Sequence, residues 1–289
     1  MIITNTDCTN NTNNAMSCPI RIVELDCSPL VVDYGYEVTD KDLLAQWIAD
    51  LCLGHYRQIR KIIEQIEPKM PATEDDAIDD IVSKLTLTDD ADNRSVYRRD
   101  GWLFQMMSWI ALNVDLHEKF NKEKIFMAPP HTAPGQHGLD GLAVVLDDKK
   151  LLGSIIITED KCSEKPRNIM TSQIFPEFVK FEKGVCKNRI VTGVTSLIEP
   201  VDDGDVIDAV QDDIAKKDYR KYRIGITRLD EHADAEGRKK LFADYDKKVN
   251  GDGKRRRASS VYVGDVRPWM ADLAAKVIAN LNSKKRAHV

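Results

Sequence analysis

Several features that define common classes of protein are missing from this sequence. Every apolar run is shorter than the roughly 18–20 residues of a membrane-spanning helix, so we expect no membrane segment. The N-terminus lacks a basic region followed by an apolar core, which predicts a cytoplasmic protein without a secretory leader. Neither a glycine-rich phosphate loop nor a nucleophile elbow is present, which disfavours the enzymes that depend on those motifs.

Cysteine pairs and an excess of positive charge are also missing. The six cysteines are scattered without a CxxC pair, which predicts reduced thiols and excludes a zinc ribbon. The formal net charge of −5 argues against a protein that coats nucleic acid through bulk charge. A nuclease with this charge balance would need a local basic patch, or a partner that delivers the DNA.

The composition that is present is typical of a globular protein. Hydrophobic residues make up 42% and charged residues 31% of the 289 positions, which suits one large domain or two ordinary ones. Asn and Thr are frequent in residues 1–20, which we expect to be a disordered segment. Residues 21–93 are predicted to form a mainly helical region, and a polar linker at residues 89–93 separates them from a second domain at residues 94–289.

Periodic apolar patterns predict the elements of both parts. An apolar stripe indicates a helix from Thr39 to residue 66, which Gly54 could divide, and a shorter helix over residues 74–85. Residues 102–112 are apolar almost all round, which is typical of a buried helix. Further on, the pattern predicts strands at 142–146, 151–158, 189–197, 222–227 and 261–263, and helices at 171–183, 205–217, 233–249 and 267–282. This order predicts an α/β fold with a mixed sheet flanked by helices.

The most informative stretch is the hairpin at residues 138–161, where two apolar strands are joined by a polar turn. If residues 148–149 form the centre of the turn, Asp140 lies opposite Ile157. Glu159 is then the diagonal neighbour of Asp140, about 7–8 Å away between backbones. Carboxylates at that separation can share a divalent ion.

The residues at the open end of this hairpin suit metal-assisted cleavage of phosphodiesters. Glu159 and Lys161 point to one face, because side chains alternate along a strand. Asp140 and Glu159 are predicted to bind Mg²⁺ or Mn²⁺ together with the backbone carbonyl of Asp160, since hard cations prefer oxygen ligands. Lys161 is predicted to orient the attacking water, so the predicted catalytic residues are Asp140, Glu159 and Lys161. The alternative is a solvated strand end with an ion pair of little energetic consequence.

Two further residues are candidates for accessory roles. Gln105 is the polar member of the apolar helix at residues 102–112, and a buried amide needs partners. It is expected to bond a neighbouring backbone, and the alternative is that it reaches the metal site. His137 lies in the Pro/Gly loop at residues 128–138, three positions before Asp140, and is a candidate for supporting the site.

A basic run follows a glycine-rich turn near the end of the chain. We expect this run to lie on a flexible loop that binds nucleic-acid phosphate, and the alternative is a solvated group of charges. Its members are Lys254, Arg255, Arg256 and Arg257.

The order of these patterns resembles the PD-(D/E)xK nuclease superfamily, which has a restriction-endonuclease-like fold. Its core runs from a helix through a three-stranded antiparallel meander to a second helix and a further strand. Residues 102–112 and 171–183 look like the two helices, and residues 189–197 look like the further strand. The motif positions match as Asp140, Glu159 and Lys161.

More narrowly, residues 40–285 resemble the HamA (DUF1837) family, the nuclease effectors of the bacterial Hachiman anti-phage defence system. The resemblance implies a metal-dependent DNA nuclease that is held in check by a superfamily 2 helicase partner, HamB. Related nucleases often carry a glutamate in the first core helix, where this sequence has Gln105. A third metal-binding carboxylate is therefore not expected here.

Three functions are compatible with these patterns. The first is the metal-dependent DNA nuclease, and the second is a catalytically inactive adaptor of the same fold that positions the helicase. The third is a small-molecule α/β enzyme with the Pro/Gly loop as a lid, which the missing phosphate loop and nucleophile elbow disfavour.

Overall fold

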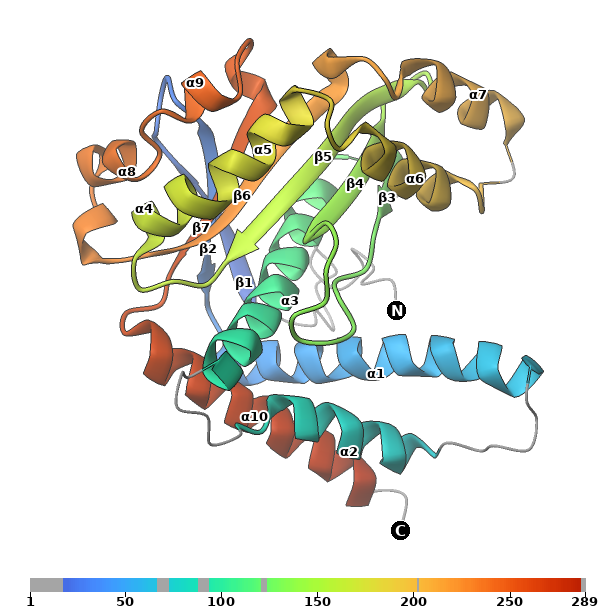
Figure 1. Ribbon diagram of the computed structural model, residues 1–289. Coiled ribbons are helices and arrows are strands. Elements are labelled where there is room, and N and C mark those ends of the chain that lie inside the picture. Colours follow the sequence, from blue (N-terminus) through green and yellow to red (C-terminus); the bar gives the residue numbers. More distant parts are fainter. Residues whose placement is uncertain (1–17, 67–72, 88–93, 121–123, 202, 287–289) are drawn as a thin grey trace, which may run out of the picture.

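The computed structural model describes residues 18–66, 73–87, 94–120, 124–201 and 203–286 (Figure 1). Most of the expected disordered segment, residues 1–20, and the expected linker at residues 89–93 lie outside these ranges. The described chain is an α/β protein built on one mixed sheet of seven strands, as the alternating patterns predicted.

The sheet has a parallel centre and an antiparallel hairpin at each edge. Its order is β1-β2-β7-β6-β5-β4-β3. The pairs β2·β7, β7·β6 and β6·β5 are parallel, whereas β1·β2, β5·β4 and β4·β3 are antiparallel. The strands are β1 (Ile20–Leu25), β2 (Val32–Val38), β3 (Ile125–Met127), β4 (Gly141–Leu146), β5 (Leu152–Lys161), β6 (Arg220–Arg228) and β7 (Arg256–Tyr262).

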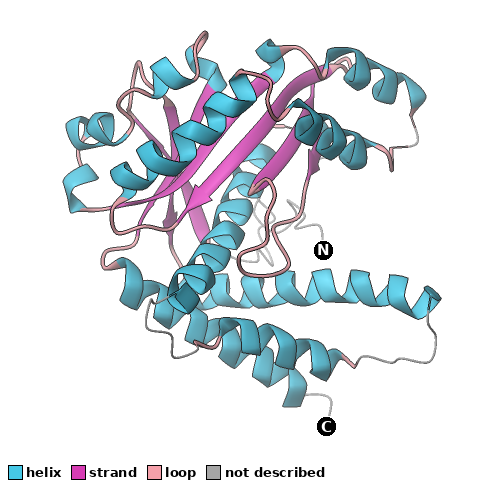
Figure 2. Cartoon of the chain, viewed as in Figure 1, coloured by secondary structure: helices cyan, strands magenta, loops and turns pink. Residues whose placement is uncertain are grey.

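Helices cover both faces of the sheet and form a further layer at one end of it (Figures 1 and 2). The long helices are α1 (Lys41–Ile66), α2 (Glu74–Leu85), α3 (Arg94–Lys119), α6 (Lys187–Ile198), α7 (Gly204–Asp213) and α10 (Val266–Arg286). The short ones are α4 (Pro166–Ile169), α5 (Phe175–Glu182), α8 (Ala235–Leu241) and α9 (Tyr245–Lys248), with a π-helical turn at Met170–Ile174 between α4 and α5. Single 3₁₀ turns lie at Lys217–Tyr219, Asp230–His232 and Gly253–Arg255.

The hydrophobic core is divided by the sheet, because successive residues of a strand point to opposite faces. Ile155 and Ile157 of β5 are buried in one cluster with Phe178 of α5 and Val194 of α6. Ile156 is buried on the opposite face with residues of α3. The strand is therefore apolar on both sides, as expected for a strand covered by two layers of helices.

One predicted strand is a helix. Residues 189–197 belong to α6, and their buried side chains are Ile190, Val194 and Ile198, which recur every four residues. This spacing places them on one helical face, and that face packs against the sheet. The strand that lies beside β5 and follows the helices is β6.

The other predicted elements differ mainly in their ends. The helix that begins near Thr39 is continuous through Gly54, and the helix at residues 102–112 is the middle of the much longer α3. The helix expected at residues 233–249 is two short helices, α8 and α9. The break falls at Asp244, whose φ of 67° is incompatible with a right-handed helix.

The two parts predicted from the sequence share the sheet and the helical layer. β2 pairs with β7, and α10 packs along α1 and α2 (Figure 1). The largest core cluster includes Leu44 and Ile48 of α1, Ile78 of α2 and Leu273 of α10. The division at residue 93 stays a prediction. None of the helices in the described ranges combines the length and apolar character needed to cross a membrane.

Candidate functional site

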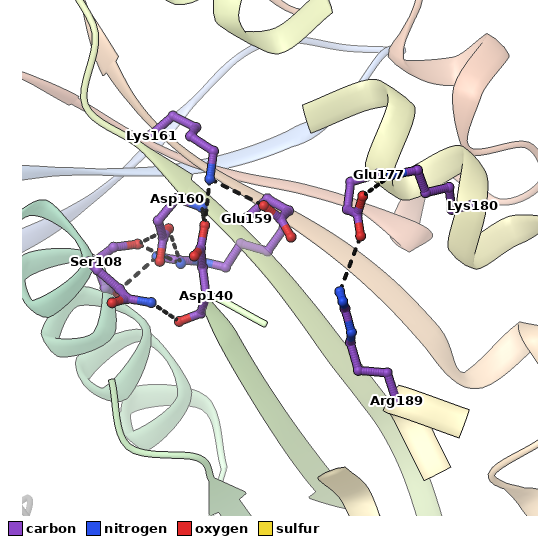
Figure 3. A network of polar contacts seen from close by, with 10 residues as sticks. Ser108, Asp140, Glu159, Asp160, Lys161, Glu177, Lys180 and Arg189 are labelled. Atoms are coloured by element: carbon purple, nitrogen blue, oxygen red, sulfur yellow. Dashed lines mark hydrogen bonds and ion pairs between the residues drawn. The ribbon is translucent and has the colours of Figure 1, made fainter. Parts of the chain in front are cut away.

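The acidic and basic residues of the hairpin meet at the C-terminal end of β5. Its antiparallel partner β4 begins at Gly141, opposite Thr158, so Asp140 stands just beyond the last pair. Glu159 shares a face with Ile155 and Ile157, whereas Asp160 points toward α3 (Figure 3). The hairpin therefore places Asp140 next to the Glu159-Asp160-Lys161 triplet, as the sequence predicted.

The register of the hairpin differs from the predicted one by two residues. Leu142, not Asp140, lies opposite Ile157, which brings Asp140 directly beside Glu159 instead of diagonal to it. The turn is longer than expected, because the last pair before it is Leu146 with Leu152. The pairing also contains an irregularity, a shift of register between Val145 and Leu146. A bulge of this kind adds one residue to one strand and re-aims the side chains that follow.

Lys161 bridges the two carboxylates. Its Nζ lies 2.8 Å from an Oδ of Asp140 and 3.3 Å from an Oε of Glu159 (Figure 3). The same oxygen of Asp140 accepts a hydrogen bond of 2.9 Å from the backbone N–H of Asp160. The three predicted catalytic side chains are thus in direct contact.

The electrostatics of this cluster are dominated by burial. Burial and the neighbouring Asp140 raise the pKa of Glu159 to about 8, although Lys161 acts in the opposite direction. Burial alone would lower the pKa of Lys161, but Asp140 and Glu159 together raise it above its ordinary value. Glu159 can therefore hold or release a proton near neutral pH, whereas Lys161 stays charged.

Asp160 is held on the opposite face of β5 by residues that the sequence did not indicate. Its Oδ1 accepts a 2.5 Å hydrogen bond from the Ser108 hydroxyl of α3 and lies 3.6 Å from the Arg223 guanidinium of β6. Arg223 also donates to the Ser108 hydroxyl at 2.8 Å. A Cβ at Gly225 would lie 1.9 Å from Asp160 Oδ1, so only glycine leaves room for this side chain.

This buried network fixes the backbone that positions Asp140. Burial raises the pKa of Asp160 to about 6, although Arg223 opposes the shift. The side chain of Asp160 is anchored to α3 and β6, and its N–H holds the Asp140 carboxylate. Residues far apart in the chain create this arrangement, so no local pattern could have revealed it.

Gln105 supports the site from α3. Its Nε2 donates to the backbone carbonyl of Asp140 at 2.8 Å, and its Oε1 accepts from the backbone N–H of His131 at 3.4 Å. The side chain is buried, and its partners are the neighbouring backbone groups that the sequence favoured. It thereby ties the Pro/Gly loop to the start of β4. His137 is exposed in that loop and lines the cleft beside the site.

Glu177 of α5 is a further acid close to the cluster. It contributes to the raised pKa of Glu159, after burial and Asp140. Its own carboxylate is bonded to Lys180 at 2.8 Å and to Arg189 at 3.2 Å (Figure 3). The spacing from Glu177 to Lys180 is an ordinary helical ion pair, so nothing in the sequence distinguished this acid.

The basic run does not form a flexible phosphate-binding loop. Arg255, Arg256 and Arg257 are buried, and two of them belong to β7. Arg255 pairs with Glu182 of α5 at 2.6 Å, and Arg257 pairs with Asp115 of α3 at 2.6 Å. Arg256 donates to four backbone carbonyls, those of Pro29, Leu30, Val249 and Gly251, at 2.6 to 3.5 Å. The prediction is wrong for these three arginines, because distant groups already bind their guanidinium groups.

Lys254 is the exposed member of the basic run. It lies in the turn that precedes β7, and its role in binding nucleic acid stays a prediction.

An open cleft of about 620 Å³ lies beside the carboxylates. It is bounded by the N-terminal part of α3, the Pro/Gly loop, the end of β5 and the start of α10. Asp140, Asp160 and Lys161 are among its lining residues. A molecule bound there would lie against the cluster.

The oxygen donors at the cluster fit a hard divalent ion. Asp140 and Glu159 both lie within 3.3 Å of one ammonium nitrogen, and additional positive charge would stabilise the ionised form of Glu159. An extended residue directs its N–H and C=O to the same side, so the Asp160 carbonyl faces the side of Asp140. Mg²⁺ commonly uses one or two carboxylates and keeps several waters. In the ranges that the structure describes, no three carboxylate, imidazole or thiol groups form a metal site of their own.

The fold and the site together define an α/β protein with a mixed sheet and a cluster of two carboxylates and a lysine at a strand end. Comparison of the chain with family models, with curated proteins and with solved structures found no match in any of the three.

Proposed function

We propose that this protein is a metal-dependent nuclease that hydrolyses phosphodiester bonds in DNA. The observation that carries the proposal is the contact of Lys161 with both Asp140 and Glu159 at the end of one hairpin. Two carboxylates and a lysine in contact supply the groups that phosphodiester hydrolysis needs. The cleft beside them is lined by Asp140 and Lys161 and gives a strand access to these two groups.

Each residue has a defined role in this proposal. Asp140 and Glu159 hold the cation, with the backbone carbonyl of Asp160 as a further oxygen ligand. Bound Mg²⁺ or Mn²⁺ would neutralise the phosphoryl oxygens and lower the pKa of a water molecule. Lys161 stays protonated and donates hydrogen bonds, so it orients the attacking water and balances the growing negative charge. Gln105 and Asp160 keep Asp140 in place through backbone contacts.

The order of elements around the hairpin supports a PD-(D/E)xK nuclease core. The chain runs from α3 through the antiparallel meander β3-β4-β5 to α4 and α5, and then by way of α6 and α7 to β6, which pairs with β5. This is the order of helix, meander, helix and further strand of that superfamily. Asp140 directly precedes the second strand of the meander, and Glu159 and Lys161 lie at the end of the third, where the motif of the superfamily lies.

A plasmid-cleavage assay tests the proposal. Wild-type protein is expected to nick or linearise supercoiled plasmid with Mg²⁺ and to lose this activity in EDTA. Glu159→Gln and Lys161→Ala are each expected to reduce the rate about 100-fold or more, since positioned groups of this kind contribute at least that much.

Lys149→Ala is the matched control for these variants. Lys149 is exposed in the turn at the opposite end of the hairpin, so its removal changes the net charge without touching the site. Full activity of this variant beside inactive Glu159→Gln and Lys161→Ala supports the proposal. Equal activity of all four proteins would sink it.

The proposal includes a partner. The resemblance to the HamA family supports an effector of anti-phage defence that is restrained by a helicase of the HamB kind. A net charge of −5 favours weak intrinsic affinity for DNA, which suits a nuclease whose substrate is delivered by a partner. Tight binding of duplex DNA by the isolated protein, with a steep salt dependence, would contradict this part of the proposal.

The second candidate function is a catalytically inactive adaptor of the same fold. One observation favours it: the ammonium of Lys161 already bonds both carboxylates, at 2.8 Å and 3.3 Å. In that case Lys161 would be a permanent structural bridge between Asp140 and Glu159. Wild-type protein that cleaves no DNA, with or without the helicase, would favour the adaptor.

A further inference from the structure

The cleft beside the carboxylates is lined by a distinctive set of side chains. We call it the α3–α10 cleft, after the helices on two of its sides, and the residues that matter here are Tyr97, Arg98, His131, Gln173 and Arg267. The set combines an aromatic ring, guanidinium groups and neutral polar groups. Its volume of about 620 Å³ is within the range of sites that bind small molecules or single groups of a polymer.

Tyr97 provides an exposed ring that is supported from one side. The residue is 56% exposed although it belongs to a helix that is otherwise largely buried. The guanidinium of Arg267 lies 4.9 Å from the ring centroid. Arg267 is itself fixed by Asp100 at 2.5 Å and Glu164 at 3.2 Å. The ring is therefore held beside a fixed cation while most of its surface stays available.

Arg98 provides a charge that the fold does not neutralise. It is exposed, and it has no ion pair with any residue in the described ranges. Its side chain lies along the Pro/Gly loop, with Nε 3.7 Å from the position of a Cβ at Gly135. The arginines at positions 255–257, by contrast, are buried against acids and carbonyls. Arg98 is thus available to an anion in the cleft.

The remaining polar groups of the cleft can recognise a neutral ligand. Burial lowers the pKa of His131, which favours the neutral imidazole. One ring nitrogen of His131 bonds the backbone of Leu139, which leaves the other nitrogen to accept a hydrogen bond. Gln173 is exposed and offers both a donor and an acceptor through its amide. Neutral groups of this kind match the edges of nucleic-acid bases.

We propose that the α3–α10 cleft binds an unpaired stretch of DNA strand, with a base stacked on Tyr97 and a phosphate at Arg98. This inference rests on the proposed nuclease function and names its substrate class as single-stranded DNA. The bases of a duplex are stacked on one another, so their faces cannot reach a side chain unless they are unpaired. An aromatic ring and an unpaired cation that line the same cleft are the combination that single-strand binding uses.

The experiment measures binding separately from cleavage. Fluorescein-labelled oligonucleotides are titrated with wild-type protein in EDTA and followed by fluorescence anisotropy, one as a single strand and one as a hairpin duplex of the same sequence. The single strand is expected to bind at least about fivefold more tightly. Tyr97→Ala is expected to weaken that binding at least about fivefold, whereas Tyr97→Phe keeps it. Arg98→Ala is expected to lower the slope of log K against log salt by about 0.7.

Exposed residues elsewhere serve as matched controls. Lys149→Ala removes one positive charge and Tyr262→Ala removes one exposed ring, and both lie outside the cleft. Both are expected to leave binding of the single strand unchanged. Thermal unfolding of every variant is expected to match that of wild type, since all four positions are exposed.

The outcomes of the two assays separate the two proposals. Binding of the single strand that depends on Tyr97 and Arg98 supports the inference, even if the protein cleaves no DNA and the nuclease proposal fails. Equal binding of single strand and duplex, binding that ignores both residues, or no binding at all overturns the inference. Plasmid cleavage that requires Glu159 would in that case leave the nuclease proposal intact.

Discussion

Glu159 is a buried acid that stays protonated at pH values where an exposed glutamate is ionised. Its pKa is raised to about 8, chiefly by burial and then by Asp140. In the unfolded chain the same group ionises near its ordinary value of about 4.3. The folded state therefore binds the proton more tightly, so this group's contribution to stability is present at low pH and is lost as the pH rises through about 8.

Replacing Glu159 with glutamine removes the loss of stability that accompanies ionisation of this group. Relative to wild type, Glu159→Gln is expected to gain at least about 2 kcal/mol of unfolding free energy between about pH 5 and pH 8, without divalent metal. Chemical denaturation of both proteins at a series of pH values measures this difference in unfolding free energy. Glu236→Gln changes an exposed glutamate and should show no such trend. A parallel pH dependence of wild type and Glu159→Gln would contradict the expectation.

Gly225 is the residue whose side chain the site cannot accommodate. Gly225→Ala is expected to destabilise the protein by about 3 kcal/mol, because the new methyl group would overlap Asp160 Oδ1 and press on Ser108. It is also expected to reduce plasmid cleavage, since Asp160 would no longer hold Asp140. The measurements are thermal unfolding and the cleavage rate.

Gly101 in α3 is the matched control for this substitution. A Cβ there would meet no atom within 4 Å, so Gly101→Ala is expected to stabilise the helix by about 0.5–1 kcal/mol. If both substitutions had the same effect, the crowding at Gly225 would not be the cause.

Local sequence predicted which side chains meet at the end of the hairpin but not all their surroundings. Asp140, Glu159 and Lys161 could be found because they share one hairpin, and strand alternation fixes their faces. The register was wrong by two residues, because neither the turn length nor the bulge has a clear sequence signal. Ser108 and Arg223 could not be found, since they come from other elements.

At the scale of elements, Asp160 and Arg223 couple β5 to β6 in the interior. In a double-mutant cycle, Asp160→Asn and Arg223→Leu are each expected to lower the free energy of unfolding by about 3–5 kcal/mol. The double variant is expected to lose about 1–3 kcal/mol less than the sum of the two single losses. The reason is that each single change leaves a buried polar group without its partner. Urea denaturation of the four proteins gives the coupling energy.

The exposed pair Arg21 and Glu37 provides the comparison for this cycle. These residues bond across β1 and β2, but both side chains are more than half exposed. Their coupling energy is expected to be below about 1 kcal/mol, because solvent screens such pairs. A larger coupling at the surface pair than at the buried pair would refute the role assigned to Asp160 and Arg223.

Two elements show why local patterns can mislead. α6 is rich in β-branched residues, which favour strands, but Ile190, Val194 and Ile198 recur with the helical spacing. The basic run looked like a solvated loop, whereas Arg255 and Arg257 pair with Glu182 and Asp115, 73 and 142 residues away. Such partners are set by the tertiary structure and leave no local signal.

At the scale of the whole molecule, the N-terminal elements complete the structure of the later ones. A fragment of residues 94–289 would lose β2 from the edge of β7 and would lose α1 and α2 from α10. It would expose core residues such as Leu273 and Val277, so we expect no cooperative unfolding transition for this fragment. Circular dichroism during heating measures it.

Co-expression with residues 1–93 as a separate chain is the control. It is expected to restore a soluble complex with a cooperative transition, because it supplies the missing strand and helices. Cooperative unfolding of residues 94–289 alone would show instead that the boundary at residue 93 separates independent domains.

The position of α10 in the chain has a consequence for synthesis. This helix follows every strand of the sheet, yet it carries Arg267 into the cleft and packs along α1 and α2. A nascent chain that stops before residue 266 therefore contains Asp140, Glu159 and Lys161 but has neither a finished cleft nor a closed helical layer. Interrupted translation would thus release a product whose carboxylates have no complete binding surface beside them.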